Sequence, residues 1–380
     1  IYNVGTLNFQ AGHITGNLST TNGGGIHSVG IINMSGGTIS NNLASATSDT
    51  TISGASFGGG IYNSNGVITI TSGTISGNKA VHGAGIDSRN ISSKLSVKIT
   101  NGTFTNNDAS SGNGGFLHMF GNSEISGGSF TNNKGNRGGA IYTRKDDTNT
   151  VDVGFIISGG TFTGNTANER GGALCNDGYA VTTITGGTFQ NNKSDKGGAI
   201  DNMEHAELRL QGNPVISGNR NLDETAENNI YLRNNIPLKV TGALTNTTKI
   251  GVNLLSYPNA FTIGFGTYNS GKSPATYFSS DHAAYTVLSI TGSTVEGMFG
   301  KSGTSTTNMV PVPTVQTNLF YSGTAQTIIN GYVANKMTAS SVTSGASAYN
   351  NTYRATNAGV YSVTFTPSGS YTWPDGTKTA

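Results

Sequence analysis

The chain has 380 residues, of which only 11% are charged, and its formal net charge is +2. This balance leaves no basic footprint for nucleic acid and no polybasic patch for a membrane. No apolar run is long enough for a membrane-spanning helix, so no direct membrane insertion is expected, and the single cysteine, Cys175, excludes an internal disulfide framework. Glycine is abundant at 56 residues, but apolar residues recur at fixed places, which indicates an ordered repeat.

Two short phrases recur throughout residues 1–230. The first reads Phe-x-x-Asn, with clear copies at Phe104 and Asn107, Phe130 and Asn133, Phe162 and Asn165, and Phe189 and Asn192. The second reads Gly-Gly-Ala-Ile or a close variant, with the glycine pairs Gly138 and Gly139, Gly171 and Gly172, and Gly197 and Gly198. Successive closing residues of the second phrase lie between 24 (Leu117 to Ile141) and 35 (Ile26 to Ile61) positions apart, the size of a stacked supersecondary unit.

Short alternating or β-branched segments, which are typical of strands, separate the phrases. Examples are residues 67–70, 96–99, 181–184 and 207–210. Three short strands per repeat of about 25 residues, with Gly and Asn turns between them, predict an all-β fold in which residues 1–228 form a right-handed parallel β-helix. Because Ile1-Tyr2-Asn3 matches a segment inside a later repeat, we expect the chain to begin within a repeat of a longer protein.

Stacked coils lie about 4.8 Å apart, as neighbouring strands do, so each residue lies on its own copy in the next coil. The Phe of the first phrase is therefore predicted to form an internal apolar column. The Asn three residues later is predicted to form a ladder of side-chain amide hydrogen bonds and to tolerate a left-handed corner. The glycine pairs are expected to supply a tight turn and to let the coils approach closely.

The pairing of G-G-A-[ILV] with F-x-x-N is best preserved where the second phrase spans 138–141, 171–174 and 197–200. This pairing resembles the repeat of the chlamydial polymorphic outer membrane proteins and of related β-helical adhesin-like surface proteins. The resemblance covers roughly residues 1–230. It implies a surface-displayed stalk that is used in adhesion.

The phrases stop after residue 228, and strand-like segments follow. Residues 229–308 are predicted to form the last coils and a cap, because an open β-helix end exposes a pairing edge. Residues 309–313 look like a linker, and the remaining chain carries the alternating run 359–366 and ends in Trp-Pro-Asp-Gly-Thr at 373–377. Residues 309–380 thus resemble the small bacterial Ig-like modules of Gram-positive surface proteins, which implies a small Ig-like β-sandwich.

One charged loop interrupts an otherwise weakly charged body. It contains Arg144, Lys145, Asp146 and Asp147, followed by Asp152. These residues are candidates for gripping a sugar or for holding Ca²⁺ through hard oxygen ligands. The alternative is a solvated bulge, in which a Lys145→Ala change would cost almost no stability. No metal site is predicted, since the two cations would offset the field of a bound ion and no pair of the six histidines has metal-ligand spacing.

A chemically mixed column is expected one residue after each closing apolar residue. Its members are Tyr2, His27, Tyr62, Asp87, His118, Tyr142, Cys175 and Asp201. Because the column is mixed, most of it is predicted to face solvent, with Cys175 as a small, semi-buried residue. The rings of Tyr62 and Tyr142 are then candidates for stacking on sugars.

The sequence offers little for catalysis. The carboxylates between the two phrases alternate with Lys and Arg, which predicts a mixed-charge edge rather than an acidic cleft; no catalytic residue and no cofactor are predicted. Threonine rows that bind ice are suggested by residues 69–71 and 183–185, which both read Thr-Ile-Thr. The intervening coils do not keep Thr-x-Thr at that position, so a continuous array is not expected.

These observations favour a non-enzymatic module of a large secreted bacterial cell-surface adhesin, either a stalk or an adhesive body, that is attached to the cell wall through other regions. Its expected partners are host or bacterial surface glycans or proteins, and it is expected to be a monomeric part of a longer chain. A polysaccharide lyase or glycoside hydrolase with a groove along the β-helix is one alternative. A purely structural spacer is the other.

Overall fold

The computed structural model describes residues 1–45, 56–89, 95–145, 154–233, 236–257, 260–291 and 295–302, and parts of residues 314–373. The chain divides into two compact units. The first comprises Ile1–Leu255 and Tyr277–Asp281, and the second comprises Ser256–Thr276 and His282–Ala380. The strands of the first unit pair in parallel from one coil to the next, so this unit is a parallel β-helix, and parallel pairing continues beyond residue 228.

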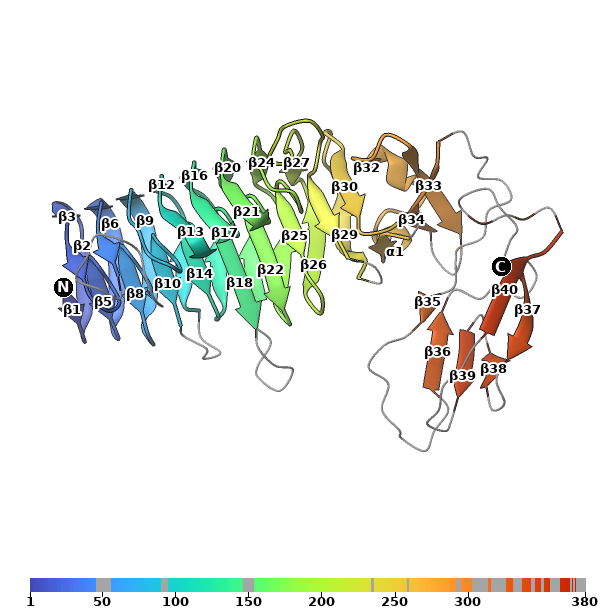
Figure 1. Cartoon of the computed structure of the whole chain (residues 1–380), viewed down its shortest axis with the longest axis horizontal. Coiled ribbons are helices and arrows are strands. Elements are labelled where there is room, and N and C mark those ends of the chain that lie inside the picture. Colours follow the sequence, from blue (N-terminus) through green and yellow to red (C-terminus); the bar gives the residue numbers. More distant parts are fainter. Residues whose placement is uncertain are drawn as a thin grey trace. The chain divides into compact units, whose positions relative to one another are not determined.

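One sheet, sheet A, takes one strand from each coil (Figure 1). Its strands, in spatial order, are β1 (Tyr2–Asn3), β5 (Ile26–Ser28), β8 (Ile61–Asn63), β10 (Ile86–Ser88), β14 (Leu117–Met119), β18 (Ile141–Lys145), β22 (Leu174–Gly178), β25 (Ile200–Asn202), β28 (Ile230–Leu232), β30 (Ile250–Leu254) and β32 (Phe278–Ser280). Spatial order equals chain order, as expected when each coil lies on the one before it.

The second sheet, sheet B, consists of two ladders that share long strands in the early coils. The first ladder contains β2 (Thr6–Phe9), β6 (Ile31–Ser40), β9 (Val67–Ser76), β11 (Val97–Ile99), β15 (Ser123–Ile125), β19 (Gly154–Ile157), β23 (Val181–Ile184), β26 (Glu207–Gly212) and β29 (Leu238–Leu244). The second, the Phe ladder, contains β3 (His13–Thr15), β6, β9, β12 (Thr103–Thr105), β16 (Ser129–Thr131), β20 (Thr161–Thr163), β24 (Thr188–Gln190) and β27 (Val215–Ile216).

Short strands also pair at the third side of some coils. They are β4 (Leu18–Ser19) with β7 (Leu43–Ala44), and β13 (Asp108–Asn113) with β17 (Lys134–Arg137) and β21 (Thr166–Arg170).

The Phe ladder supplies the centre of the core. Phe104, Phe130, Phe162 and Phe189 are fully buried. The ring centroids of Phe130 and Phe162 lie 4.5 Å apart at an interplanar angle of 6°, and those of Phe162 and Phe189 lie 4.5 Å apart at 4°. The predicted internal column is confirmed, and the nearly parallel rings show that these coils are related almost by pure translation.

The predicted asparagine ladder is also confirmed. In each coil the backbone N–H and the side-chain Nδ2 of Asn donate to the Oδ1 of the Asn in the next coil, as Asn133 does to Asn165 at 3.0 Å for both bonds. The rungs run through Asn17, Asn42, Asn78, Asn107, Asn133, Asn165, Asn192, Asn219 and Asn229. The carboxylate of Asp281 accepts the last two donors, from the N–H and the Nδ2 of Asn229.

One expectation for this Asn is wrong. The left-handed corner is occupied not by the ladder Asn but by the residue before it, such as Asn106 and Asn132, each with φ 56°. Gly164 takes the same place in its coil, with φ 67°. The two asparagines of the Asn-Asn pair therefore have different tasks, because one makes the turn and the other makes the rung.

The two glycines of each pair are required for different reasons. The first has a positive φ, 67° at Gly138 and 62° at Gly171, which makes the tight turn. The second lies where a Cβ would clash with the next coil, since a Cβ on Gly139 would lie 2.1 Å from the carbonyl oxygen of Gly172. Both predicted roles, the turn and the close approach, are confirmed.

The second unit contains β31 (Thr262–Ile263), the short helix α1 (Phe265–Tyr268), the 3₁₀ turn Pro274–Thr276 and the antiparallel hairpin β33 (Tyr285–Thr291) with β34 (Val295–Lys301). The carboxylate of Glu296 accepts hydrogen bonds from the Thr262 hydroxyl and from the backbone N–H groups of Gly264 and Phe265. This carboxylate fixes the entry to α1.

Later residues of the second unit form antiparallel pairs. The strands are β35 (Thr314–Val315), β36 (Gln326–Asn330), β37 (Met337–Val342), β38 (Ala346–Tyr349), β39 (Thr352–Ala355) and β40 (Val363–Pro367). They form a sheet in the order β35-β36-β39-β38 and the separate pair β37-β40. Buried Met337 and Trp373 pack together with Phe365 and Tyr371. The Ig-like sandwich and the cap stay predictions, and Asp375 to Thr377 of the terminal motif lie outside the described residues.

None of the helices in the described part of the chain is long and apolar enough to cross a membrane.

Candidate functional site

The mixed column predicted after each closing apolar residue is formed by the central residues of the sheet A strands. The register places Tyr62, Asp87, His118, Tyr142, Cys175, Asp201 and Tyr231 next to one another in successive coils. Their neighbours within each strand are buried in the core, so these side chains point to the outside of the sheet.

The expectation that most of this column faces solvent is wrong for the middle coils. Asp87, Cys175 and Asp201 are 0% exposed and Tyr142 is 1% exposed, whereas Tyr62 is half-buried. The cover comes from residues that precede the glycine pairs, including His82, Arg137 and Arg170, and from residues that follow the column on its strands. We call the column together with these covering residues the A-face strip.

A charged and aromatic cluster forms the N-terminal part of the A-face strip. The carboxylate of Asp87 lies 2.6 Å from Nδ1 of His118 and accepts a 2.7 Å hydrogen bond from Nε of Arg89. The Arg89 guanidinium lies between two rings, 4.1 Å from the centroid of Phe57 and 4.8 Å from that of Phe120. The carboxylate of Asp87 is therefore bound on two sides, and Arg89 is held by cation–π contacts.

His82 stacks on His118 with ring centroids 5.1 Å apart, and its Nδ1 accepts the backbone N–H of Asn113 at 3.1 Å. Burial and the neighbouring His118 lower the pKa of His82 to about 4 from an ordinary value of 6.5. Because the folded protein holds this imidazole neutral, the unfolded chain takes up a proton first. The contribution of neutral His82 to the free energy of unfolding is therefore full above pH 6.5 and is lost as the pH falls toward 4.

We expect His82→Gln to reduce this acid sensitivity. Urea unfolding of the two proteins at neutral pH and at about pH 5 should show that the wild type loses about 1 kcal/mol more stability than the variant, after allowance for partial solvent screening. Titrating groups that do not interact with His82 contribute equally to both proteins and cancel in the difference. Equal losses would show that His82 titrates normally in the folded state.

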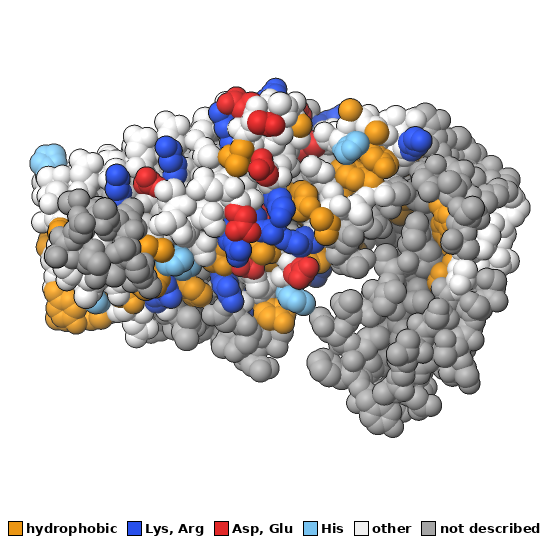
Figure 2. Space-filling view, in the orientation of Figure 1, with side chains coloured by type: hydrophobic (Ala, Val, Ile, Leu, Met, Phe, Trp, Pro, Cys, Tyr) orange, Lys and Arg blue, Asp and Glu red, His pale blue; other side chains and the backbone are white. Residues whose placement is uncertain are grey.

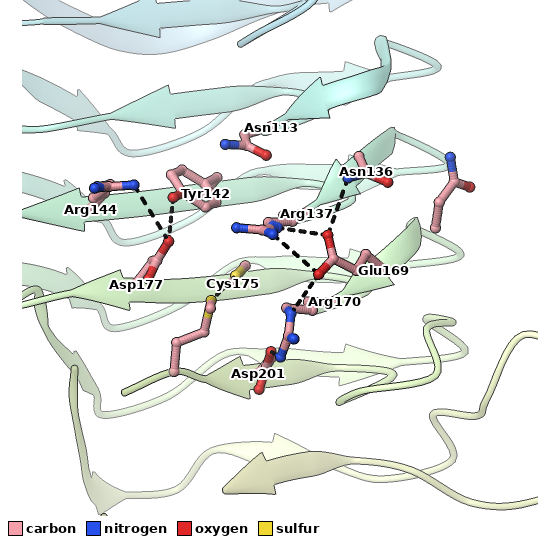
Figure 3. A network of polar contacts seen from close by, with 12 residues as sticks. Asn113, Asn136, Arg137, Tyr142, Arg144, Glu169, Arg170, Cys175, Asp177 and Asp201 are labelled. Carbon is pink, nitrogen blue, oxygen red and sulfur yellow. Dashed lines mark hydrogen bonds and ion pairs between the residues drawn. The ribbon is translucent and has the colours of Figure 1, made fainter. Parts of the chain in front are cut away.

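An ion-pair network follows in the next coils (Figure 3). Arg137 donates to Glu169 through Nε at 2.8 Å and through Nη2 at 3.2 Å, and Nε of Arg170 donates to the same carboxylate at 2.9 Å. Arg170 also reaches Asp201, with Nη1 3.3 Å from Oδ2. The hydrogen bond from Arg137, with that from Arg170, lowers the pKa of Glu169 to about 2.

Asp201 has the opposite electrostatic environment to Glu169. Burial raises the pKa of Asp201 to about 6, against the opposing effect of Arg170. Its Oδ1 has no hydrogen-bond partner within the described part of the chain.

Tyr142 is held by Asp177, with 2.5 Å between the hydroxyl and Oδ2, and Arg144 lies 4.0 Å from the same carboxylate (Figure 3). Burial and the hydrogen bond to Asp177 raise the pKa of Tyr142. Burial also raises the pKa of the Cys175 thiol, which lies 3.7 Å from the sulfur of Met203. The thiol is fully rather than partly buried, and it is not a reactive thiolate.

The structure separates the predicted ligand-binding residues. The side chain of Arg144 is 46% exposed, but Lys145 lies at the end of β18 and is only 7% exposed. The prediction that Lys145→Ala would cost almost no stability assumed an exposed side chain, and the burial of Lys145 removes that assumption. The ring of Tyr142 has no exposed face for a sugar, and Tyr62 remains accessible in part. Asp146, Asp147 and Asp152 lie outside the described residues.

Asp177, Arg89 and the pairing of Arg170 with Asp201 were not predicted from the sequence. One signal was present, because a charged or aromatic residue precedes the glycine phrase in most coils, as His82, Arg137 and Arg170 do, although an asparagine such as Asn113 stands there in the others. Figure 2 shows acidic and basic side chains interspersed over the middle coils, as expected for a mixed-charge edge. No group of three or more His, Cys, Asp or Glu side chains among the described residues is arranged to hold a metal ion.

The geometry defines a parallel β-helical repeat protein whose outer polar strip is closed by internal contacts. The model of the Chlamydia polymorphic membrane protein (Chlamydia_PMP) repeat matches residues 127–144 and 159–177. The chain therefore carries repeats similar to those of polymorphic membrane proteins, as their phrases indicated. No curated protein and no solved structure matched the chain.

Proposed function

We propose that this chain is the non-enzymatic body or stalk of a bacterial cell-surface adhesin. One observation carries the proposal: the residues that recur, Phe, Asn and Gly, are used inside the coil for packing, rungs and turns. The similarity to the polymorphic membrane protein repeat supports a place at the cell surface. Host or bacterial glycans or proteins would then be bound by residues that vary between coils, through many weak contacts along the stack.

The contacts of the A-face strip favour this proposal over a polysaccharide lyase or glycoside hydrolase. A glycosidase requires two carboxylates on either side of the scissile bond, about 5–9.5 Å apart and free to reach it. Asp87, Glu169 and Asp177 are instead bound to arginine, histidine or tyrosine side chains. Loss of polysaccharide turnover in a protein with Asp146→Ala and Asp147→Ala would nevertheless establish the enzymatic alternative.

Adhesion is tested by coating beads with the chain and measuring retention on host cells, bacterial cells and glycan arrays. We expect retention on at least one surface and a weaker signal for Arg144→Ala, because this exposed cation lies beside the charged loop. Lys134→Ala is the matched control, since it removes one charge from an exposed side chain on another side of the coil. No retention on any surface, beside a working lectin control, would favour the spacer instead.

A further inference from the structure

The outward side of the Phe ladder carries two continuous columns of hydroxyl groups. Five successive coils present a Thr or Ser on both sides of the buried Ile or Phe, and the next coil adds Thr188. These residues, which we call the threonine face, are Thr38, Ser40, Thr74, Ser76, Thr103, Thr105, Ser129, Thr131, Thr161, Thr163 and Thr188. Thr-x-Thr itself occurs in two of these coils, at 103–105 and 161–163, and the other three coils have Ser at one of the two places. At the position of residues 69–71 and 183–185 the array is interrupted, as expected, and the continuous run of hydroxyl residues lies in the neighbouring strands.

The hydroxyls of the threonine face are available to an external partner. The side chains of Thr103 and Thr161 are exposed, and the other members are half-buried by their neighbours in the sheet. Within the described part of the chain, no side-chain hydrogen bond is made by Thr38, Thr74, Ser76, Thr103, Thr105, Thr161, Thr163 or Thr188. Ser129 and Thr131 bond to each other at 3.0 Å, and Ser40 donates to Thr15.

The threonine face is uncharged, and its later coils are closely aligned. The rings directly beneath it are parallel within 6° from Phe130 to Phe189, whereas those of Phe104 and Phe130 differ by 29°. The seven-residue segments that form the face, such as 101–107, 127–133 and 159–165, contain no charged residue. Threonine is stiff about χ1, so its hydroxyl and methyl positions are fixed before any partner arrives.

The face repeats in two directions. Hydroxyls in one strand are two residues apart, which is about 6.6 Å, and equivalent hydroxyls in neighbouring coils are about 4.8 Å apart. A glycan chain repeats in one direction only and is usually held by aromatic rings, which this face lacks. A protein interface would require a more apolar or aromatic centre. Three kinds of partner repeat in two directions: ice, a crystalline polysaccharide and a second copy of this face. We select ice, because the face has no aromatic rings for sugars and no apolar centre for a protein, and because the oxygen spacings on a prism plane of ice are close to the two spacings of the face.

We propose that the threonine face binds ice. Its methyl groups order the adjacent water layer, its hydroxyls take places in that layer, and the absence of charge avoids a large desolvation cost. Binding is additive over five coils, so no single residue needs to contribute much. This inference goes beyond adhesion and does not depend on it.

The test measures thermal hysteresis and the uptake of the labelled full chain into a slowly growing ice hemisphere. We expect wild-type protein to enter the ice and the double variant Thr103→Lys, Thr161→Lys to lose uptake, because two long cations project from the middle of the face. The matched control is Thr69→Lys with Thr183→Lys, on the first ladder of sheet B, which should keep wild-type uptake. Circular dichroism and melting temperature establish that all three proteins are folded.

A milder series keeps the test decisive if the lysine variant unfolds. Replacing Thr103, Thr105, Thr161 and Thr163 by valine keeps the shape and removes the hydroxyls, and we expect lower uptake with an unchanged melting temperature. Exclusion of the wild type from ice would overturn the inference, and so would equal uptake by the face and control variants. The inference would also be overturned if the face variants enter ice normally but no longer self-associate or no longer bind crystalline neutral polysaccharide. Adhesion to cells is unaffected by any of these outcomes.

Discussion

Replacing Phe162 by alanine is expected to lower the free energy of unfolding by about 3–5 kcal/mol, the usual range for a buried Phe. Phe162 is fully buried, and its ring stacks on Phe130 and on Phe189 at 4.5 Å on each side. Truncation removes both contacts and leaves a cavity that rigid coils cannot close. Urea unfolding monitored by circular dichroism gives the loss directly.

The controls for Phe162 separate packing from propensity. Phe162→Leu keeps most of the volume and should cost less than half as much as the alanine change. Thr163→Ala, one residue later and outside the core, should change the stability by no more than about 0.5 kcal/mol. Equal, small losses for all three changes would show that the phenylalanine column is not the centre of the core.

Replacing Asn165 by alanine should cost about 3–5 kcal/mol, because several buried groups lose their partners together. The Nδ2 of Asn165 donates to the carbonyl of Phe130 at 2.8 Å and to Oδ1 of Asn192 at 2.9 Å. Its own Oδ1 accepts from the backbone N–H and from Nδ2 of Asn133. Truncation leaves two donor hydrogens of Asn133 and the carbonyl of Phe130 to be satisfied by other means in a dry interior, while Oδ1 of Asn192 keeps only the backbone N–H of residue 165.

A second variant identifies which half of the amide matters. Asn165→Asp keeps the acceptor for Asn133 but cannot donate when ionised, so its carboxylate faces the carbonyl of Phe130 and the Oδ1 of Asn192. We expect this variant to be at least as unstable as alanine at neutral pH and to recover in part in acid, where a protonated carboxyl can donate. An aspartate variant as stable as the wild type would show that the ladder does not carry donor bonds.

The core was predictable from the sequence because repetition turns a sequence position into a place in the stack. Once Phe104 and Phe162 are aligned as copies, their contacts follow from the coil spacing, and the same holds for Asn107 and Asn165. The glycine pairs were predictable for the same reason, since glycine fits both the positive φ of the first position and the close backbone neighbour of the second.

The corner and the strip were harder to predict for physical reasons. Asn106 and Asn107 have the same chemistry, and the glycines that replace the first Asn in other coils indicate which of the two turns left-handed. These glycines are Gly16, Gly77, Gly164 and Gly218. The A-face strip was expected in solvent because the alternation of residues along a strand shows only which side of the sheet each residue faces. It does not show that the long side chains of Arg137 and Arg170 reach across the glycine turns and cover the neighbouring column.

The threonine face was not predicted because the two Thr-Ile-Thr segments of the sequence lie on a different strand of each coil. Thr69 and Thr183 lie in the first ladder, where the intervening coils carry Lys98, Glu124 and Ile156. The regular Thr and Ser positions lie instead on either side of the buried Ile or Phe of the Phe ladder, which was interpreted only through that buried residue. Burial of the central residue is what makes its two neighbours face outward.

The asparagine ladder also has a direction. Each rung donates toward the following coil, and the run ends on Asp281, which when ionised accepts and does not donate. Gain or loss of one whole coil upstream of that carboxylate leaves every other rung unchanged. Evolution can therefore alter the length of this unit one coil at a time, in steps of about 4.8 Å, while the carboxylate that ends the ladder stays the same.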